Sequence, residues 1–177
     1  MRLRSSTLAR PAATLLEHAI VLPLTFVLLL MMVVGSMGVF RYQETASLAR
    51  SAARYASTHG AQFRRDAGLS TGAAGSNGES ADGMHWYKAD PLANSGGTDA
   101  SWTQDIYDQA VRPNRVALDP AFMTVKVGWP AVINQSDKPD NWPNSKVSVT
   151  ITYQWTPEFF FTGPITLTST STMNITN

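Results

Sequence analysis

The sequence predicts an α+β protein in which a long N-terminal transmembrane helix continues into a juxtamembrane helix and packs against a small C-terminal antiparallel sheet of three or four strands. The residues from Ala19 to Phe40 carry no charge. At 1.5 Å per helical residue they would span roughly 33 Å, enough to cross a bilayer core of about 30 Å. The last third of the chain alternates apolar and polar residues, which is typical of strands that bury one face.

The predicted helix runs from residue 14 to about residue 59. Thr14 and Glu17 have the spacing of a capping box at its start, and Pro23 is expected to kink it. Gly60 is expected to end the helix in the left-handed conformation. Beyond the membrane, small and apolar residues share one face, while the arginines and Glu44 are expected to stay in water. That face comprises Tyr42, Ala46, Leu48, Ala49, Ala52, Ala53, Tyr55 and Ala56.

The middle of the chain offers little material for a core. From Asp66 to Asp99 there are seven Gly among Ser, Asn and Asp, and the bulky residues Met84 to Tyr87 stand alone among them. This composition predicts a long flexible loop. The run from Ser101 to Gln104 has the capping-box spacing again and predicts a short helix to about Val111, which Pro113 would end.

Three segments near the C-terminus alternate with period two. Their apolar residues are expected to form the dry face of a sheet whose other face is rich in threonine. Consecutive strands joined by loops rich in Pro, Asn and Asp predict an antiparallel meander, and the alanine-rich face of the helix is the partner available to cover it. The residues expected on the dry face are Met123, Val125, Val127, Trp129, Val147, Val149, Ile151, Tyr153, Trp155, Ile165, Leu167, Met173 and Ile175.

We divide the chain into four segments. They are a short basic leader-like segment (1–13), the transmembrane and juxtamembrane helix (14–60), a flexible loop rich in Gly, Ser and Asp (61–100), and an exported domain with a short helix and the sheet (101–177).

The orientation of the span does not follow from charge alone, because three arginines precede the apolar run and three follow it closely. Long C-terminal domains are translocated largely regardless of charge, which favours a cytoplasmic N-terminus. A secretory signal cleaved near Ser36 to Gly38 is the alternative. The apolar core of such a signal usually has only about 7–15 residues, so a retained anchor is favoured.

Charge and composition exclude several functions. Residues 1–60 have a net charge of +4 and residues 61–177 of −3, so the exported domain lacks the basic surface of a nucleic-acid-binding protein. The chain has no Cys, and its histidines, His18, His59 and His85, lack the spacing of metal ligands. No catalytic motif is present. We therefore expect a non-enzymatic protein that uses no metal or cofactor and binds no nucleic acid.

The order of these segments resembles the TadE-like pseudopilins of tight-adherence (Tad) pilus systems. The resemblance rests on a Glu just inside the apolar run, a Leu-Pro after it, an Ala- and Arg-rich helix, and two strands rich in Ser and Thr. The matching stretches are Ala12–Glu17, Ala19–Pro23, Ala49–Ala56, Val147–Tyr153 and Leu167–Met173. They leave the middle of the chain unmatched.

The resemblance implies a pilin-like fold and a minor subunit that helps to assemble or prime a Tad-type pilus or secretion machine. Its implied partners are other pilin or pseudopilin subunits, the inner-membrane pilus platform, a prepilin peptidase and the lipid bilayer. Its implied location is the bacterial inner membrane, with the C-terminal domain outside the cytoplasm or incorporated in an extracellular pilus. The family's processing bond corresponds to Ala12–Ala13, where Ala12 replaces the usual Gly, and His18 replaces the aromatic residue that often follows the Glu.

Three candidate sites keep two interpretations each. By the resemblance, the Glu17 carboxylate neutralises the amino terminus of a neighbouring subunit during assembly; alternatively it stabilises the start of its own helix. Pro23 either supplies a kink needed for packing or is simply tolerated by a membrane helix. The triplet Phe159, Phe160 and Phe161 either packs over the sheet edge or contacts another subunit.

Two classes of function therefore remain open. The first is the assembly subunit. The second is a membrane-tethered extracytoplasmic binding or adhesion module that uses the loop from 66 to 99 as its binding surface.

Overall fold

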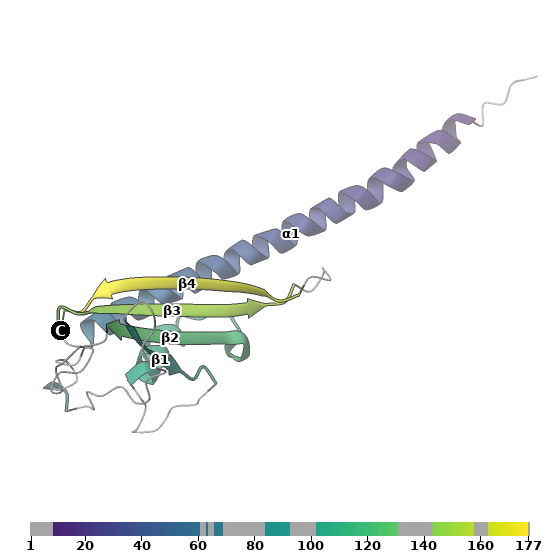
Figure 1. Cartoon of the computed structure of the whole chain (residues 1–177). Coiled ribbons are helices and arrows are strands. Elements are labelled where there is room, and N and C mark those ends of the chain that lie inside the picture. The colour runs from purple at the N-terminus through teal and green to yellow at the C-terminus, as the bar shows by residue number, and fades with distance from the viewer. Residues whose placement is uncertain are drawn as a thin grey trace, which may run out of the picture. The chain divides into compact units, whose positions relative to one another are not determined.

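The computed structural model describes residues 9–60, 63, 66–68, 84–92, 102–130, 143–157 and 163–176. The predicted α+β class is confirmed: a long N-terminal helix is followed by a four-stranded antiparallel sheet (Figure 1). The chain divides into two compact units, Met1–Val39 and Phe40–Asn177. The elements are α1 (Ala9–Thr58), β1 (Met84–Ala89), α3 (Trp102–Ile106), the π-helical turn η1 (Tyr107–Val111), the 3₁₀ turn η2 (Pro120–Phe122), β2 (Met123–Pro130), β3 (Lys146–Trp155) and β4 (Ile165–Asn174).

The first unit contains the N-terminal part of α1. The helix begins at Ala9, five residues before the predicted start, and runs without interruption through Pro23. Pro11 is tolerated because the first N–H groups of a helix have no intrahelical partner. Thr14 therefore lies inside the helix and cannot be its N-cap, so the predicted capping box is wrong. The carbonyl of Thr14 instead accepts a 2.8 Å hydrogen bond from Nδ1 of His18.

The apolar run of α1 satisfies its own polar groups. Thr25 Oγ1 donates to the Val21 carbonyl at 2.9 Å, and Ser36 Oγ donates to the Met32 carbonyl at 2.8 Å. The large apolar side chains around this run are exposed on all sides. Of the residues the structure describes, α1 is the one helix long and apolar enough to cross a membrane.

The second unit contains the end of α1 and the sheet, whose strands follow one another in the order β1-β2-β3-β4. The three predicted strands are confirmed, and their antiparallel register places Val125 opposite Ile151 and Thr150 opposite Thr170. The fourth strand, β1, comes from the segment predicted to be loop. It pairs with β2 along its whole length, with Trp86 opposite Gly128.

The core of this unit lies between the sheet and the last turns of α1 (Figure 1). The predicted dry faces of β2 and β3 are buried, whereas Ile165 is exposed and Leu167 and Met173 of β4 are half-buried. Burying a Val, Leu or Ile side chain contributes about 1.5–3 kcal/mol. The buried apolar residues of α1, β2 and β3 are Leu48, Ala49, Ala52, Ala53, Ala56, Met123, Val125, Val127, Trp129, Val147, Val149, Ile151, Tyr153 and Trp155.

Three residues of α1 do not lie where the sequence pattern predicts. Tyr42, which was expected on the buried face, is exposed, and Glu44, which was expected in water, is buried. Arg41, which was also expected in water, is half-buried. Glu44 can be buried because its carboxylate binds the backbone of the segment before β2. Helical periodicity could not indicate this contact, because it joins residues more than seventy positions apart.

The C-terminal end of α1 is hydrogen-bonded to Thr176, which follows β4. Gly60 does not adopt the predicted left-handed conformation, which among the described glycines is found at Gly68. Instead, Thr176 donates to the Ser57 carbonyl from both its backbone N–H (2.9 Å) and its hydroxyl (3.2 Å). This partner satisfies one of the carbonyls that a helix leaves unpaired at its end.

The short helix before β2 changes type along its length. It is α-helical from Trp102 to Ile106 and π-helical from Tyr107 to Val111, where the prediction had one uniform helix. Gln104 binds the backbone of Asp90 just after β1, donating from Nε2 to the carbonyl at 3.0 Å and accepting from the N–H at 2.8 Å. This helix therefore fixes the position of β1.

Candidate functional site

The sequence-predicted site residues lie in separate parts of the chain. Ala12 and Ala13 belong to the first turns of the α1 backbone, and Glu17 lies about one turn further on with an exposed side chain. Within the described part of the chain, Glu17 forms no ion pair. Pro23 follows within the helix. The triplet Phe159–Phe161 lies outside the described residues, so both of its interpretations stay predictions.

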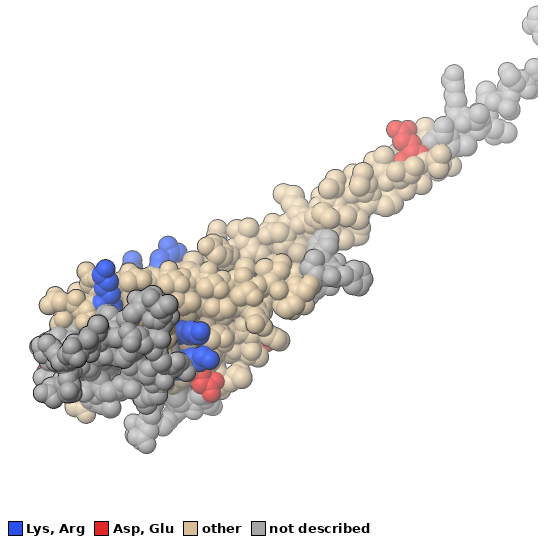
Figure 2. Space-filling model, viewed as in Figure 1, with Lys and Arg blue, Asp and Glu red and all other residues tan. Residues whose placement is uncertain are grey.

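The surface of α1 between Leu15 and Phe40 is almost entirely apolar. Figure 2 shows this part of the helix without charge over most of its length. An apolar surface of this length must be covered by lipid or by other apolar helices, because exposing it to water is unfavourable. Its exposed large side chains are Leu15, Leu16, Ile20, Val21, Leu22, Leu24, Phe26, Val27, Leu28, Leu29, Met31, Met32, Val33, Met37, Val39 and Phe40.

Arg41 is the first charged residue after the apolar run, and it lies against the aromatic end of β3. Its guanidinium carbon is 5.3 Å from the ring centroid of Trp155 and 5.8 Å from that of Tyr153. Its Nη1 also donates to the Tyr153 hydroxyl at 3.3 Å. A cation over aromatic faces is attracted by their electron-rich centres. Arg41 therefore binds α1 to the sheet at the point where the charged part of the chain begins.

Glu44 lies one turn further along and holds the segment that leads into β2. Oε1 accepts from the backbone N–H of Val116 at 2.7 Å and of Ala117 at 2.9 Å, and Oε2 accepts from Ala117 at 3.2 Å. Charge-assisted bonds of this kind compensate for the burial of a carboxylate. The role of Glu44 does not follow from the sequence, in which its one distinguishing feature is a charge beside the alanine-rich face of the helix.

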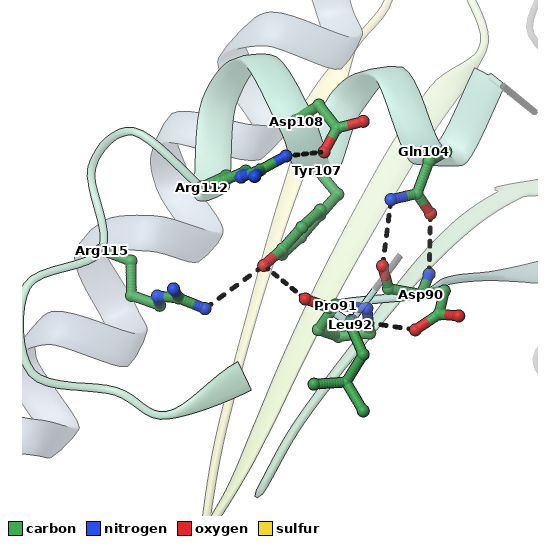
Figure 3. Close-up of polar contacts among 8 residues, drawn as sticks. All are labelled: Asp90, Pro91, Leu92, Gln104, Tyr107, Asp108, Arg112 and Arg115. Carbon is green, nitrogen blue, oxygen red and sulfur yellow. Dashed lines mark hydrogen bonds and ion pairs between the residues drawn. The ribbon is translucent and has the colours of Figure 1, made fainter. Parts of the chain in front are cut away.

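A polar cluster around Tyr107 joins the short helix to β1 (Figure 3). The Tyr107 hydroxyl donates to the Pro91 carbonyl at 3.1 Å and accepts from Arg115 Nη1 at 3.4 Å. Burial raises the pKa of Tyr107 above its ordinary value of 10.0, although Arg115 and Arg112 act to lower it. A tyrosine with a raised pKa stays neutral at physiological pH, so this cluster is suited to structure and not to nucleophilic or base chemistry.

The outer face of the sheet carries a ladder of hydroxyl groups across β3 and β4. Thr150 and Thr170 lie 2.8 Å apart, Thr152 and Thr168 lie 3.4 Å apart, and the Thr172 hydroxyl donates to Ser148 at 3.2 Å. β4 is an edge strand with no Lys, Arg, Asp, Glu or Pro. Edge strands without such residues are open to pairing with another chain.

The described residues offer little for catalysis. No group of three His, Cys, Asp or Glu among them could hold a metal ion. A shallow groove of about 240 Å³ on α1 is lined by Ser47, Arg50, Ser51 and Arg54. What these residues provide chemically is hydrogen bonding, charge and packing surface. No protein-family model, curated protein or solved structure matches the chain.

Proposed function

We propose that this protein is a non-enzymatic, minor pseudopilin-like subunit that helps to assemble or prime a Tad-type pilus or secretion machine. The observation that carries the proposal is α1 itself. One continuous helix supplies an exposed apolar surface over its first part and the buried alanine face of the sheet domain over its last part. A helix of this kind can pack among other helices while it displays a folded domain. The proposal places the helix in the bacterial inner membrane and the domain outside the cytoplasm.

The Glu17 carboxylate supports an assembly role. It lies near the start of the apolar run, exposed and without an ion-pair partner among the described residues. A lone carboxylate at the edge of a membrane span is stabilised when a positive group of another subunit approaches it, since water is scarce there. In the proposed assembly that positive group is the amino terminus of a neighbouring subunit, released by a prepilin peptidase between Ala12 and Ala13.

The edge of β4 supports the same role. Its backbone bonds only to β3 among the described residues, and it has no charge or proline to prevent pairing with another subunit. The second candidate function is a membrane-tethered binding or adhesion module. The hydroxyl ladder on the outer face favours it, because rows of hydroxyl groups can form hydrogen bonds with a polar ligand.

The test is complementation of a strain that lacks this protein. Glu17→Ala and Glu17→Gln are each expressed, with His18→Gln as the matched control in the same turn of the helix. We expect both Glu17 variants to reach the membrane at the normal level. Cells that express them should display fewer surface pili, and less pilin should be recovered with the variant protein after crosslinking. Normal piliation with either Glu17 variant would overturn the assembly role of the carboxylate. Normal piliation in the deletion strain itself would overturn the pseudopilin function and leave the binding module.

A further inference from the structure

The exposed large apolar side chains among the described residues of the sheet-bearing unit gather, with one exception, at one end of it. Six such side chains are exposed in the described parts of Phe40–Asn177. Five of them form what we call the interfacial patch, and Leu92, beyond β1, stands apart. The members of the patch are Phe40, Tyr42, Val116, Phe122 and Ile165, with exposed fractions of 52%, 51%, 83%, 55% and 41%.

The patch surrounds the first turn of α1 in this unit, because contacts with that turn hold the segments that carry its members. Arg41 lies over Trp155, and Trp155 is opposite Ile165 in the strand register. Arg41 also bonds to Tyr153, which is opposite Met123, the residue after Phe122.

The remaining member is held by the next turn of α1. Glu44 binds the backbone N–H of Val116 directly. Residues from α1, from the segment before β2, from η2 and from β4 therefore converge on the turn from Phe40 to Glu44. Two of them, Phe40 and Tyr42, belong to that turn itself.

We propose that the interfacial patch lies in the headgroup layer of the membrane that α1 spans, so that the domain rests on the bilayer surface. This inference depends on the membrane anchor of the proposed function. The apolar run of α1 ends at Phe40, which marks the edge of the hydrocarbon core. The headgroup layer extends about 5–7 Å beyond that edge. Glu44 is four residues further on, or about 6 Å along the helix, so the patch lies at the depth of that layer.

The chemistry of this end suits a lipid surface. Aromatic side chains prefer the boundary between hydrocarbon and water, and the patch contains two Phe and one Tyr. Among the described residues in or next to these segments, the charged groups are Arg41, Arg115, Glu44 and Asp119. The two carboxylates accept backbone hydrogen bonds, Glu44 from Val116 and Ala117 and Asp119 from Ala121, whereas the arginines can also meet lipid phosphates.

The chain has no Cys, so single-cysteine variants can report the surroundings of each position. Val116→Cys, Phe122→Cys and Ile165→Cys are labelled with a polarity-sensitive fluorophore in the full chain, reconstituted in phosphatidylcholine and phosphatidylglycerol vesicles. Leu92→Cys is the matched control, because it is 66% exposed and outside the patch. Met32→Cys, within the apolar run, reports the anchor. Lipids with a nitroxide near the headgroup, or deep in the acyl chain, serve as quenchers.

We expect the three patch positions to show blue-shifted emission and strong quenching by the shallow nitroxide, while Leu92→Cys shows neither. Met32→Cys should be quenched by the deep nitroxide. If Met32→Cys is quenched but the patch positions behave like Leu92→Cys, the anchor stands and the docking of the domain is wrong. If Met32→Cys is not quenched, the anchor and the docking both fail. Blue-shifted patch positions that no nitroxide lipid quenches would show that protein, not lipid, covers the patch.

Discussion

Glu44 and Val116 are joined by a 2.7 Å hydrogen bond from the backbone N–H of Val116 to the carboxylate. The bond links α1 to the segment that leads into β2, and Ala117 adds a second donor at 2.9 Å. A buried carboxylate, held by two backbone groups, therefore joins the helix to the segment before β2. This contact and that of Arg41 with Tyr153 and Trp155 occupy consecutive turns of the helix.

Replacing Glu44 by Ala should destabilise the domain by about 1–3 kcal/mol, because two backbone donors lose a charged acceptor. Glu44→Gln should cost less, since its amide oxygen can still accept one bond. Arg50→Ala, at an exposed position on the same helix, is the control and should stay within about 0.5 kcal/mol of the unchanged protein. Denaturant unfolding of the full chain in detergent micelles measures these differences. Equal stability of Glu44→Ala and Arg50→Ala would contradict the role given to the carboxylate.

Gly128 leaves room for the ring of Trp86, the residue opposite it in β1. A Cβ added at position 128 would come within 2.7 Å of the Trp86 ring, closer than atoms tolerate. Gly128→Ala should therefore displace the ring and destabilise the domain by about 1–3 kcal/mol. Gly163→Ala is the matched control, because a Cβ there meets nothing within 4 Å. A difference of less than about 0.5 kcal/mol between the two variants in denaturant unfolding would show that Trp86 does not need this contact.

Sequence periodicity predicts those parts of the fold in which the face that a residue occupies, buried or exposed, follows from its neighbours in the sequence. The strands β2 and β3 are of this kind, as is the face of α1 that carries Ala49, Ala53 and Ala56. Strand β1 was missed because it is short, lies in a segment rich in Gly and Ser, and depends on a glycine in the next strand. The one sequence feature that pointed to this strand was a tryptophan with no local partner.

The residues of the candidate site also fall into those that the sequence indicates and those that it does not. Glu17 is a candidate from the sequence because a charge next to an apolar run is visible there, and its assembly role stays a prediction. Glu44 was missed because its partners lie in a different segment, and no local pattern distinguishes a carboxylate that binds backbone N–H groups from one in water. Nor does the sequence indicate the interfacial patch, since strand pairing brings Phe122 and Ile165 to the first turn of α1 in this unit, and the hydrogen bond to Glu44 brings Val116 there.

Tyr107 should make the stability of the domain depend on alkaline pH. Its pKa is raised above 10.0 in the folded state, while an unfolded tyrosine ionises near 10. As the pH rises above about 10, the unfolded chain loses this proton first, so the free energy of unfolding should fall until the pH passes the folded pKa.

Tyr107→Phe removes this titration and also the hydrogen bond to Pro91. The variant should be less stable by about 1 kcal/mol at neutral pH, and the gap should narrow above about pH 10. Unfolding measured with both proteins from pH 7 to 11 tests the sign. A gap that widens with pH would mean that the folded protein holds the ionised form, against the desolvation of this buried hydroxyl.

The start of the mature protein is the most decisive measurement for the proposed function. The Ala12–Ala13 bond lies in the first turns of α1, which begins at Ala9. Extending residues 9–13 in a peptidase shortens the helix by those residues and so breaks only about five backbone hydrogen bonds, one for each residue removed. We therefore expect mass spectrometry of the membrane fraction to find a chain that starts at Ala13. The variant Ala12→Leu, with a bulkier residue before the bond, should accumulate uncleaved.

A chain that starts near Val39, in the soluble fraction, would overturn the anchor and the pseudopilin function together. An intact N-terminus would remove the processing step alone, and Glu17 would then have no newly released amine to neutralise.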